Sequence, residues 1–270
     1  MNRKVLVIAA ALAAASAHMS AHAGSLTFAN LTHGAVITDD NDPAVPRYSG
    51  FDPTDFGVTK ITATNVGGGP NIGVAFDTNK SSTRDPDLQF DPQNGWSGGN
   101  IAGTDLGFIA ILQENSYYCG DGVCNKPDDE GSRPAGSLIF EFEDDLTEIG
   151  FDLIDVEGPN EYGNDSGYVA VFYDGSTELA SVGFGEFIDD GSAFFQGYDF
   201  QYGNNYANRV DPITAAQLGI SSFDKVEFNF GGSMGIDNLV WETVTVSAPE
   251  PGTLALLVAG LAFAGYRRRA

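Results

Sequence analysis

The feature that most limits the fold of this chain is a series of short segments in which apolar and polar residues alternate. The clearest is SLIFEFE at 137–143, which places its leucine and two phenylalanines on one face and its glutamates on the other. EIGFDL at 148–153 and KVEFNF at 225–230 repeat this pattern. Alternation of this kind indicates β-strands with one buried face.

Other segments predict further strands and a hairpin. The segment GYVAVFYDGSTELASVGF at 167–184 predicts two strands that turn at Asp174-Gly175. The remaining strand candidates are KITAT (60–64), IGVAF (72–76), LGFIAIL (106–112) and IDNLVWETVTV (236–246).

One short helix is predicted at DPITAAQLG, residues 211–219. Asp211 would be its N-cap, Pro212 its first helical residue and Gly219 its C′ residue. Helical periodicity is almost absent elsewhere, and 34 glycines supply turns throughout the chain. Short alternating strands between such turns predict an all-β fold, a β-sandwich or jelly roll, as one domain over residues 24–247.

The balance of charge is strongly acidic. The chain has 37 Asp and Glu against 13 Lys and Arg, for a net charge of −24, and five of the basic residues lie in the two end segments. The middle is therefore more acidic still, and it would repel nucleic-acid phosphates and anionic lipid head groups. Nucleic-acid binding is excluded, whereas binding of divalent cations suits such a surface.

The first 23 residues have the three parts of a secretory signal peptide. Arg3 and Lys4 precede an apolar run at 5–17, and Ala-His-Ala at 21–23 is a small-x-small cleavage pattern. Residues 1–23 are therefore predicted to direct export and to be removed.

The chain ends in an apolar segment at 252–266 that could form a helix of about 22 Å. A bilayer core is about 30 Å thick, so this is a short membrane span. The arginines that follow would stay in the cytoplasm, which leaves the acidic body outside. A simple C-terminal membrane anchor is one interpretation of this tail.

A more specific interpretation comes from the order of its parts, which are Pro249-Glu250-Pro251, the apolar stretch, and Arg267, Arg268 and Arg269. Residues 248–270 thus resemble a PEP-CTERM sorting signal. The resemblance implies recognition by exosortase, a membrane enzyme of Gram-negative bacteria that make extracellular polysaccharide. It also implies transient insertion in the inner membrane, removal of the tail, and a final place on the cell surface or in the extracellular matrix.

The only two cysteines are Cys119 and Cys124. In an exported protein, two cysteines this close in sequence are expected to form a disulfide. Closing so short a loop adds only about 2 kcal/mol, so the bridge would rigidify a loop rather than hold the fold together.

Acidic loops beside predicted strands are candidate calcium ligands, because calcium takes six to eight hard oxygen ligands. They lie in the segments DPDL, ILQE, PDD and IDVE, and none forms an EF-hand pattern. The alternative for each is a solvated acidic surface. The candidates are Asp85, Asp87, Glu114, Asp128, Asp129, Asp155 and Glu157.

The body of the chain loosely resembles lectin-like, carbohydrate-binding β-sandwich modules. The resemblance rests on FDT, DPDL, ILQE, PDD, LIDVE and the closing GIDNLVW. It implies a polysaccharide ligand, for which Trp96 in the Gly-rich loop PQNGWSGGN is the candidate platform. The alternative is a loop aromatic that folds onto the edge of the sandwich. Tyr117, Tyr118, Tyr202 and Tyr206 are weaker candidates, and Trp241 is expected in the core.

The motifs of common hydrolases are missing. There is no G-x-S-x-G, no H-E-x-x-H and no Walker loop, and a Ser-His-Asp triad would depend on His33. The sequence therefore favours a non-enzymatic, exported, polysaccharide-associated protein. Two alternatives stay open: a matrix-active glycoside hydrolase, which needs only two carboxylates, and a purely structural surface protein.

The two terminal signals predict how the mature protein differs from its precursor. Protein recovered from the cell surface should lack both residues 1–23 and the arginine cluster. Intact-mass analysis of that material measures both ends at once. Retention of Arg267–Arg269 there would contradict sorting and favour a simple anchor.

Overall fold

The computed structural model describes residues 19–39, 45–129, 131–159 and 169–246. The chain divides into two units, His22–Thr243 and Met1–Ala21 with Val244–Ala270. Most of the predicted signal peptide and all of the predicted sorting signal lie outside the described residues. The predicted cleavage point after Ala23 falls within the first strand, Met19–Leu26.

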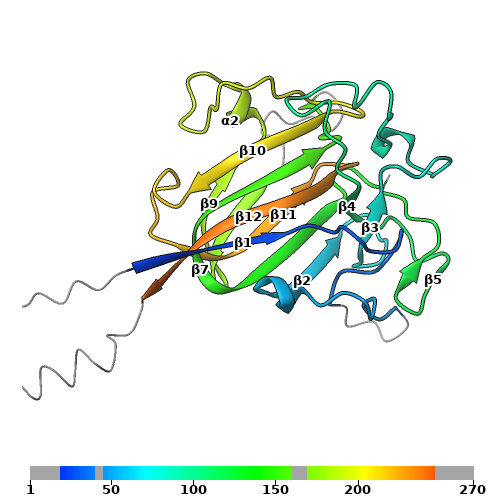
Figure 1. Cartoon of the computed structure of the whole chain (residues 1–270), viewed down its shortest axis with the longest axis horizontal. Coiled ribbons are helices and arrows are strands. Elements are labelled where there is room, and N and C mark those ends of the chain that lie inside the picture. Colours follow the sequence, from blue (N-terminus) through cyan, green and yellow to red (C-terminus); the bar gives the residue numbers. More distant parts are fainter. Residues whose placement is uncertain (1–18, 40–44, 130, 160–168, 247–270) are drawn as a thin grey trace, which may run out of the picture. The chain divides into compact units, whose positions relative to one another are not determined.

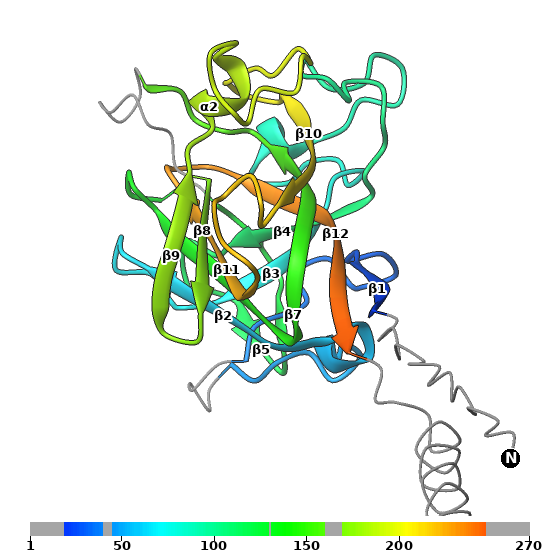
Figure 2. The same ribbon diagram turned by 90° about the vertical axis from the view of Figure 1, so that its left-hand side faces the viewer.

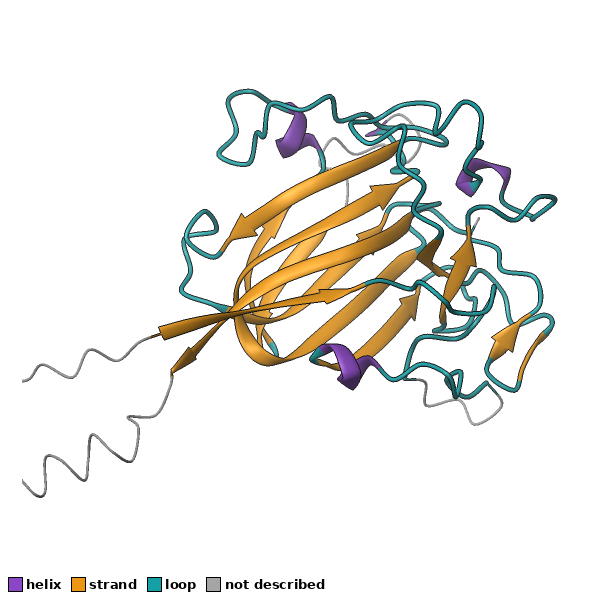
Figure 3. Ribbon diagram, viewed as in Figure 1, coloured by secondary structure: helices purple, strands orange, loops and turns teal. Residues whose placement is uncertain are grey.

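The structure is nearly all β, which confirms the predicted fold class (Figure 3). The described residues include the short helices η1 (Pro53–Phe56), η2 (Pro86–Leu88) and α2 (Gly185–Ile188). The strands are β1 (Met19–Leu26), β2 (Val58–Asn65), β3 (Gly73–Asp77), β4 (Phe108–Leu112), β5 (Cys119–Gly120), β6 (Val123–Cys124), β7 (Gly136–Ile154), β8 (Ala170–Asp174), β9 (Thr177–Val182), β10 (Ala207–Thr214), β11 (Phe223–Phe230) and β12 (Gly235–Val246).

Ten of these strands form one antiparallel sheet that curls strongly (Figures 1 and 2). Its main path runs β3-β4-β12-β7-β11-β8-β9; in addition, β1 pairs with β12, and both β2 and β10 pair with β7. A sheet that curls until its own faces oppose each other is compatible with the predicted β-sandwich.

The central strand β7 joins the halves of the sheet. Its first half pairs with β2 on one edge and β11 on the other, and its second half pairs with β10 and β12. The sequence predicted two strands here, 137–143 and 148–153, but the structure has one of 19 residues. The connecting residues include no glycine or proline to end the strand. Instead three exposed acidic residues, 143–145, interrupt the alternation where β7 changes partners.

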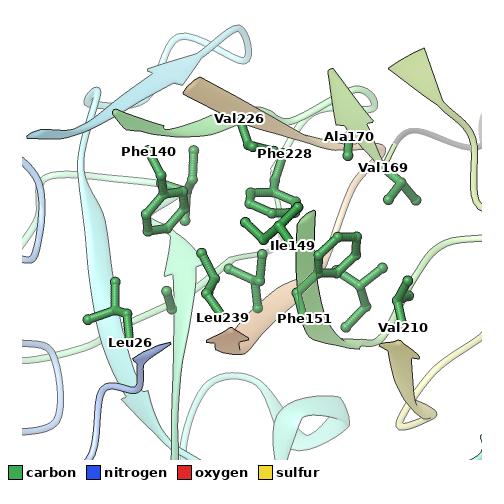
Figure 4. Close-up of a cluster of buried hydrophobic side chains, with 14 of the residues drawn as sticks. Leu26, Phe140, Ile149, Phe151, Val169, Ala170, Val210, Val226, Phe228 and Leu239 are labelled. Atoms are coloured by element: carbon green, nitrogen blue, oxygen red, sulfur yellow. The ribbon is translucent and has the colours of Figure 1, made fainter. Parts of the chain in front are cut away.

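The main core lies inside the curl and is rich in phenylalanine (Figure 4). Phe228 of β11 packs edge-to-face on Phe140 at 5.7 Å and on Phe151 at 4.9 Å, both from β7. All the residues that the alternation placed inward on β7 and β11 are buried, as predicted: Leu138, Phe140, Phe142, Ile149, Phe151, Leu153, Val226, Phe228 and Phe230.

A second apolar cluster covers the other face of β3 and β4. Ala75 and Ala110 face the main core, whereas Phe76 and Ile109 belong to the second cluster, so both strands are buried on two sides. The long connection between these strands, residues 78–107, contributes Leu88 and other apolar residues to that cluster. This connection is therefore a packed part of the domain rather than a free loop.

The predicted hairpin is confirmed as β8 and β9, but its turn lies one residue later than the predicted Asp174-Gly175. Asp174 pairs with Thr177, which leaves Gly175 and Ser176 as the two turn residues. Gly175 has φ +57°, a conformation that glycine adopts without strain.

The predicted helix at 211–219 was wrong. Residues 211–214 continue strand β10, with Pro212 at a register shift between Val210 and Ile213, where a strand tolerates a proline. Only one turn follows, capped reciprocally: Thr214 Oγ1 accepts the Gln217 amide, and Gln217 Oε1 accepts the Thr214 amide. The cap is therefore Thr214, three residues later than predicted, and Gly219 ends the turn with φ +74°.

Replacing Phe228 by alanine should cost about 3–5 kcal/mol of unfolding free energy, because it opens a cavity between two rings of β7. Urea unfolding with the disulfide intact measures the loss. Phe195→Ala is the control, since Phe195 is 42% exposed and its loss should change stability by less than about 0.5 kcal/mol. Equal effects of the two substitutions would contradict this packing.

Candidate functional site

Three of the predicted acidic residues meet in the interior of the domain. Asp85 lies just before η2, Asp129 in the segment after β6, and Asp155 directly after β7. Their exposures are 1%, 2% and 3%. Asp85 Oδ2 accepts the Asp129 amide at 2.9 Å, which ties the first two segments together. We call Asp85, Asp129 and Asp155 the acidic cluster.

Ser233, which sequence reasoning missed, bridges two members of the cluster. Its hydroxyl lies 2.9 Å from Asp129 Oδ2 and 2.5 Å from Asp155 Oδ2. The strand pairing explains this position, because Gly235 of β12 pairs with Ile154, the last residue of β7. Ser233 and Asp155 therefore lie just beyond the same end of two neighbouring strands. Only this pairing, and no local motif, could have identified the serine.

The serine hydroxyl has one proton and faces two carboxyl groups, so it can donate to only one of them. Asp129 Oδ2 also accepts the Met234 amide at 2.9 Å, which favours it as the acceptor of the serine proton. A proton held by one of the carboxyls would satisfy the second contact, because a protonated carboxyl can donate to the serine oxygen.

The electrostatics of the cluster favour bound protons. Burial raises the pKa of Asp129 well above its ordinary value, and the charge of Asp85, a side-chain hydrogen bond with Asp85 and the charge of Asp155 raise it further. Burial also raises the pKa of Asp155 to about 7, although the hydrogen bonds from Ser233 and from the Asn205 amide lower it. Asp129 Oδ1 has no hydrogen-bond partner in the described part of the chain.

The other candidates surround the cluster and bind different partners. Glu157 receives two hydrogen bonds of 2.5 Å from Arg133, and Asp128 pairs with Arg84 at 3.0 Å. Asp87 Oδ2 accepts from Asn204 at 2.9 Å. The acidic segments thus converge, as the calcium hypothesis requires, but two of these residues already have arginine partners.

Glu114 instead lines a polar groove of about 670 Å³. Three segments form its walls: 65–70, 114–117 and 131–132. They pack closely, because a Cβ on Gly69 would lie 2.0 Å from the Glu114 carbonyl oxygen. Asn65 fixes the first wall by accepting the amides of Gly67 and Gly69. The ring of Tyr117, 72% exposed, stands at the groove.

Trp96 is not the exposed platform that the sequence predicted. The indole is 3% exposed, packs on Phe90 at 5.6 Å and donates its N–H to the Thr104 carbonyl at 2.8 Å. It belongs to the second apolar cluster, so the alternative of a loop aromatic folded onto the domain is the observed one. Trp241 is 5% exposed and belongs to the main core, as expected.

The predicted disulfide is present. Cys119 and Cys124 are bonded and lie opposite each other in the two-stranded β5–β6 ribbon. Tyr118, next to the bridge, is 57% exposed, and the Lys126 ammonium lies 4.4 Å from the centre of its ring. The bridge therefore holds a surface ribbon that carries an exposed aromatic residue.

A second buried pair of carboxyls was missed by sequence reasoning. Asp152 of β7 faces Asp237 of β12, and both oxygens of Asp152 bind Arg209 at 2.8 and 2.7 Å. Asp237 is 4% exposed, and its Oδ1 has no hydrogen-bond partner among the described residues. Burial raises its pKa to about 7, and the charge of Asp152 adds to this effect. The only signal for this pair in the sequence was that Asp152 lies within a strand whose two faces are both buried.

Comparison with known families identifies the end of the chain. The PEP-CTERM protein-sorting motif matches residues 247–269, as the order of the tail's parts predicted. A protein with this motif is exported and is a substrate of exosortase, which is its sorting partner. The chain is therefore a PEP-CTERM domain-containing protein.

No curated protein and no solved structure is significantly similar to the chain. Among the helices of the described ranges, none has the length and apolar character needed to cross a membrane.

Asp237 should make stability depend on pH. Its pKa rises from 3.8 in an ordinary setting to about 7 in the native state, so folding binds a proton between these values. Stability should therefore fall as pH rises through this window, by about 1.4 kcal/mol per pH unit. Comparing urea unfolding of the wild type and Asp237→Asn in chelator isolates this group. Parallel stability curves from pH 4 to pH 7 would contradict the assignment.

Proposed function

We propose that this protein is a non-catalytic binding module that attaches to extracellular polysaccharide after its export. The observation that carries this proposal is the polar groove beside Tyr117. The groove volume lies within the range of typical ligand sites, and its lining combines amide, hydroxyl and carboxylate groups with one exposed ring. Sugars present the matching surfaces, hydroxyl edges and apolar faces.

The construction of the groove favours binding without large rearrangement. Asn115 Oδ1 accepts the amide of Tyr117 at 3.1 Å, which positions the backbone below the exposed ring. The opposite wall is fixed by the close approach of Gly67 to Ser132. A Cβ added to Gly67 would lie only 2.7 Å from the Ser132 hydroxyl oxygen. Fixed walls lower the entropy lost on binding.

Charge favours a neutral glycan. The chain carries a net charge of −24, and Glu114 adds a carboxylate to the groove itself. An anionic polysaccharide would be repelled by this field, whereas neutral sugar hydroxyls can donate to Glu114. We therefore assign neutral hexose polymers as the ligand class, and the cell surface or extracellular matrix as the location.

The hydrolase alternative would need two carboxyl groups in one cleft. The groove offers one, Glu114, among its lining residues. A smaller pocket of about 370 Å³ is lined by Asp55, Glu143 and Asp144, beside Trp241.

His33 does not support a Ser-His-Asp triad. Its Nδ1 accepts a hydrogen bond from the Asp77 amide, its ring contacts Phe76, and burial lowers its pKa to about 4.

Tyr117→Ala should weaken binding to the neutral exopolysaccharide of the producing organism about tenfold, because it removes the ring on which a sugar face packs. Affinity electrophoresis in gels that contain the polysaccharide measures the change. Tyr198→Ala is the matched control, since Tyr198 is a tyrosine of 48% exposure outside the groove.

Unchanged retention of Tyr117→Ala would contradict the groove as the binding site. No retention of the wild type on any polysaccharide would leave the purely structural alternative. Release of reducing ends from the polymer by the wild type would instead establish the hydrolase alternative.

A further inference from the structure

One wall of the polar groove is built on the segment that leads into the disulfide. Asn115, Ser116 and Tyr117 line the groove, and Cys119 follows two residues later. We call residues 115–117 the Tyr117 wall. The Cys119 amide donates to the Ser116 carbonyl at 3.2 Å, and the Cys119 sulfur lies 3.9 Å from the Asn115 carbonyl oxygen. The bridge is therefore in direct contact with the backbone of this wall.

The base of the loop that carries the wall is held by a different contact. The Gln113 side chain is fully buried and donates to the carbonyls of Asn115 at 2.9 Å and of Lys126 at 3.4 Å. Gln113 thus joins the segment that enters the loop to the segment that leaves it. This contact fixes the first residue of the Tyr117 wall, whereas the residue that carries the ring lies closer to the bridge.

The far side of the bridge is anchored to the domain. Cys124 is fully buried, and its amide donates to the Gly34 carbonyl at 2.8 Å. The Val36 amide donates to the Gly122 carbonyl, also at 2.8 Å. Strand β6 is therefore held against residues 34–36, which makes Cys124 a fixed point for whatever is bonded to it.

Strand β5, by contrast, depends on β6. The two strands pair at two positions only, and within the described ranges no other strand pairs with β5. Even longer two-stranded hairpins are only marginally stable in water when they stand alone. The covalent bond, more than the hydrogen bonds of the ribbon, therefore joins the Tyr117 wall to the anchored strand.

From this geometry we propose that the Cys119–Cys124 disulfide positions Tyr117 for ligand binding, so that the groove takes its binding form only after the bridge has formed. This inference rests on the proposed function, because it concerns the regulation of the same groove. Cys119 and Cys124 are positioning residues here, since they act on the ligand through the Tyr117 wall.

The chemistry of the bridge connects the groove to export. The two cysteine thiols give two protons and two electrons to the disulfide of a thiol oxidoreductase, which becomes a dithiol as the Cys119–Cys124 bond forms. Exported proteins meet such oxidants, whereas the cytoplasm keeps thiols reduced. The precursor in the cytoplasm therefore lacks a working groove, and the exported protein acquires one.

The first measurement needs no ligand. Hydrogen exchange is compared before and after reduction with a phosphine, which acts on this bond alone because the chain has only two cysteines. The amides of Tyr117 and Cys119 should exchange at least about tenfold faster after reduction. Those of Gly67 and Gly69 in the opposite wall should keep their rates, because the Asn65 side chain holds them. The Tm should fall by only about 4–8 °C, so the rates are measured on folded protein.

The second measurement is retention on the polysaccharide, in the gels of the Tyr117→Ala experiment. Reduction should weaken binding of the wild type about tenfold, as Tyr117→Ala does, and should weaken binding of Tyr117→Ala little further. A bridge with a merely structural role would lower both affinities by the same factor. The double variant Cys119→Ala/Cys124→Ala should bind like the reduced wild type and should not respond to the reductant. The reduced wild type provides the same test if this variant does not fold.

Two results would overturn the proposal. Equal exchange in the Tyr117 wall before and after reduction would show that the wall is held without the bridge. Equal retention of the oxidised and the reduced wild type would show that binding does not need it. If the oxidised wild type is not retained on any polysaccharide, the proposed function fails, and hydrogen exchange still decides whether the bridge positions the wall.

Discussion

The structure depends on the continuity of β7, which pairs with β2, β10, β11 and β12 along its 19 residues. A strand has only two edges, so four partners require that it pass from one half of the sheet to the other. Sheets curl where such a strand changes partners. The phenylalanine core fills that curl, and Phe228 of β11 contacts β7 residues from both halves.

The same strand determines where charge is buried. The second half of β7 is covered on both faces, so Asp152 within it and Asp155 just after it cannot reach bulk water. Each needs a compensating group, and the structure supplies two different ones. Arg209 from β10 neutralises Asp152, whereas Asp155 meets the Ser233 hydroxyl and the other carboxyls of the acidic cluster. The guanidinium thus lies within the span of β7, and beyond its end Asp155 has the Ser233 hydroxyl instead.

The sequence predicted what depends on local pattern and failed where distant pairing decides. Alternation identified the two halves of β7 as separate strands, together with β11 and the β8–β9 hairpin, and spacing identified the Cys119–Cys124 bridge. It misplaced Trp96, because a Gly-rich loop does not reveal that residues 78–107 pack over β3 and β4. It took part of β10 for a helix, since nothing local shows that Pro212 lies at a bulge. Asp85, Asp129 and Asp155 were among the candidate ligands named from the sequence, which left open whether they meet; the structure brings them together, and Ser233 could be identified only from the register of β12 on β7.

The acidic cluster and the groove are physically connected. The Glu114 amide donates to the Asp128 carbonyl at 2.8 Å, so the segment that holds Asp129 also supports the wall of the groove. Because that segment is held at Asp129 by Ser233 and Met234, the pairing of the central strands determines the position of the groove wall as well as that of the buried carboxyls.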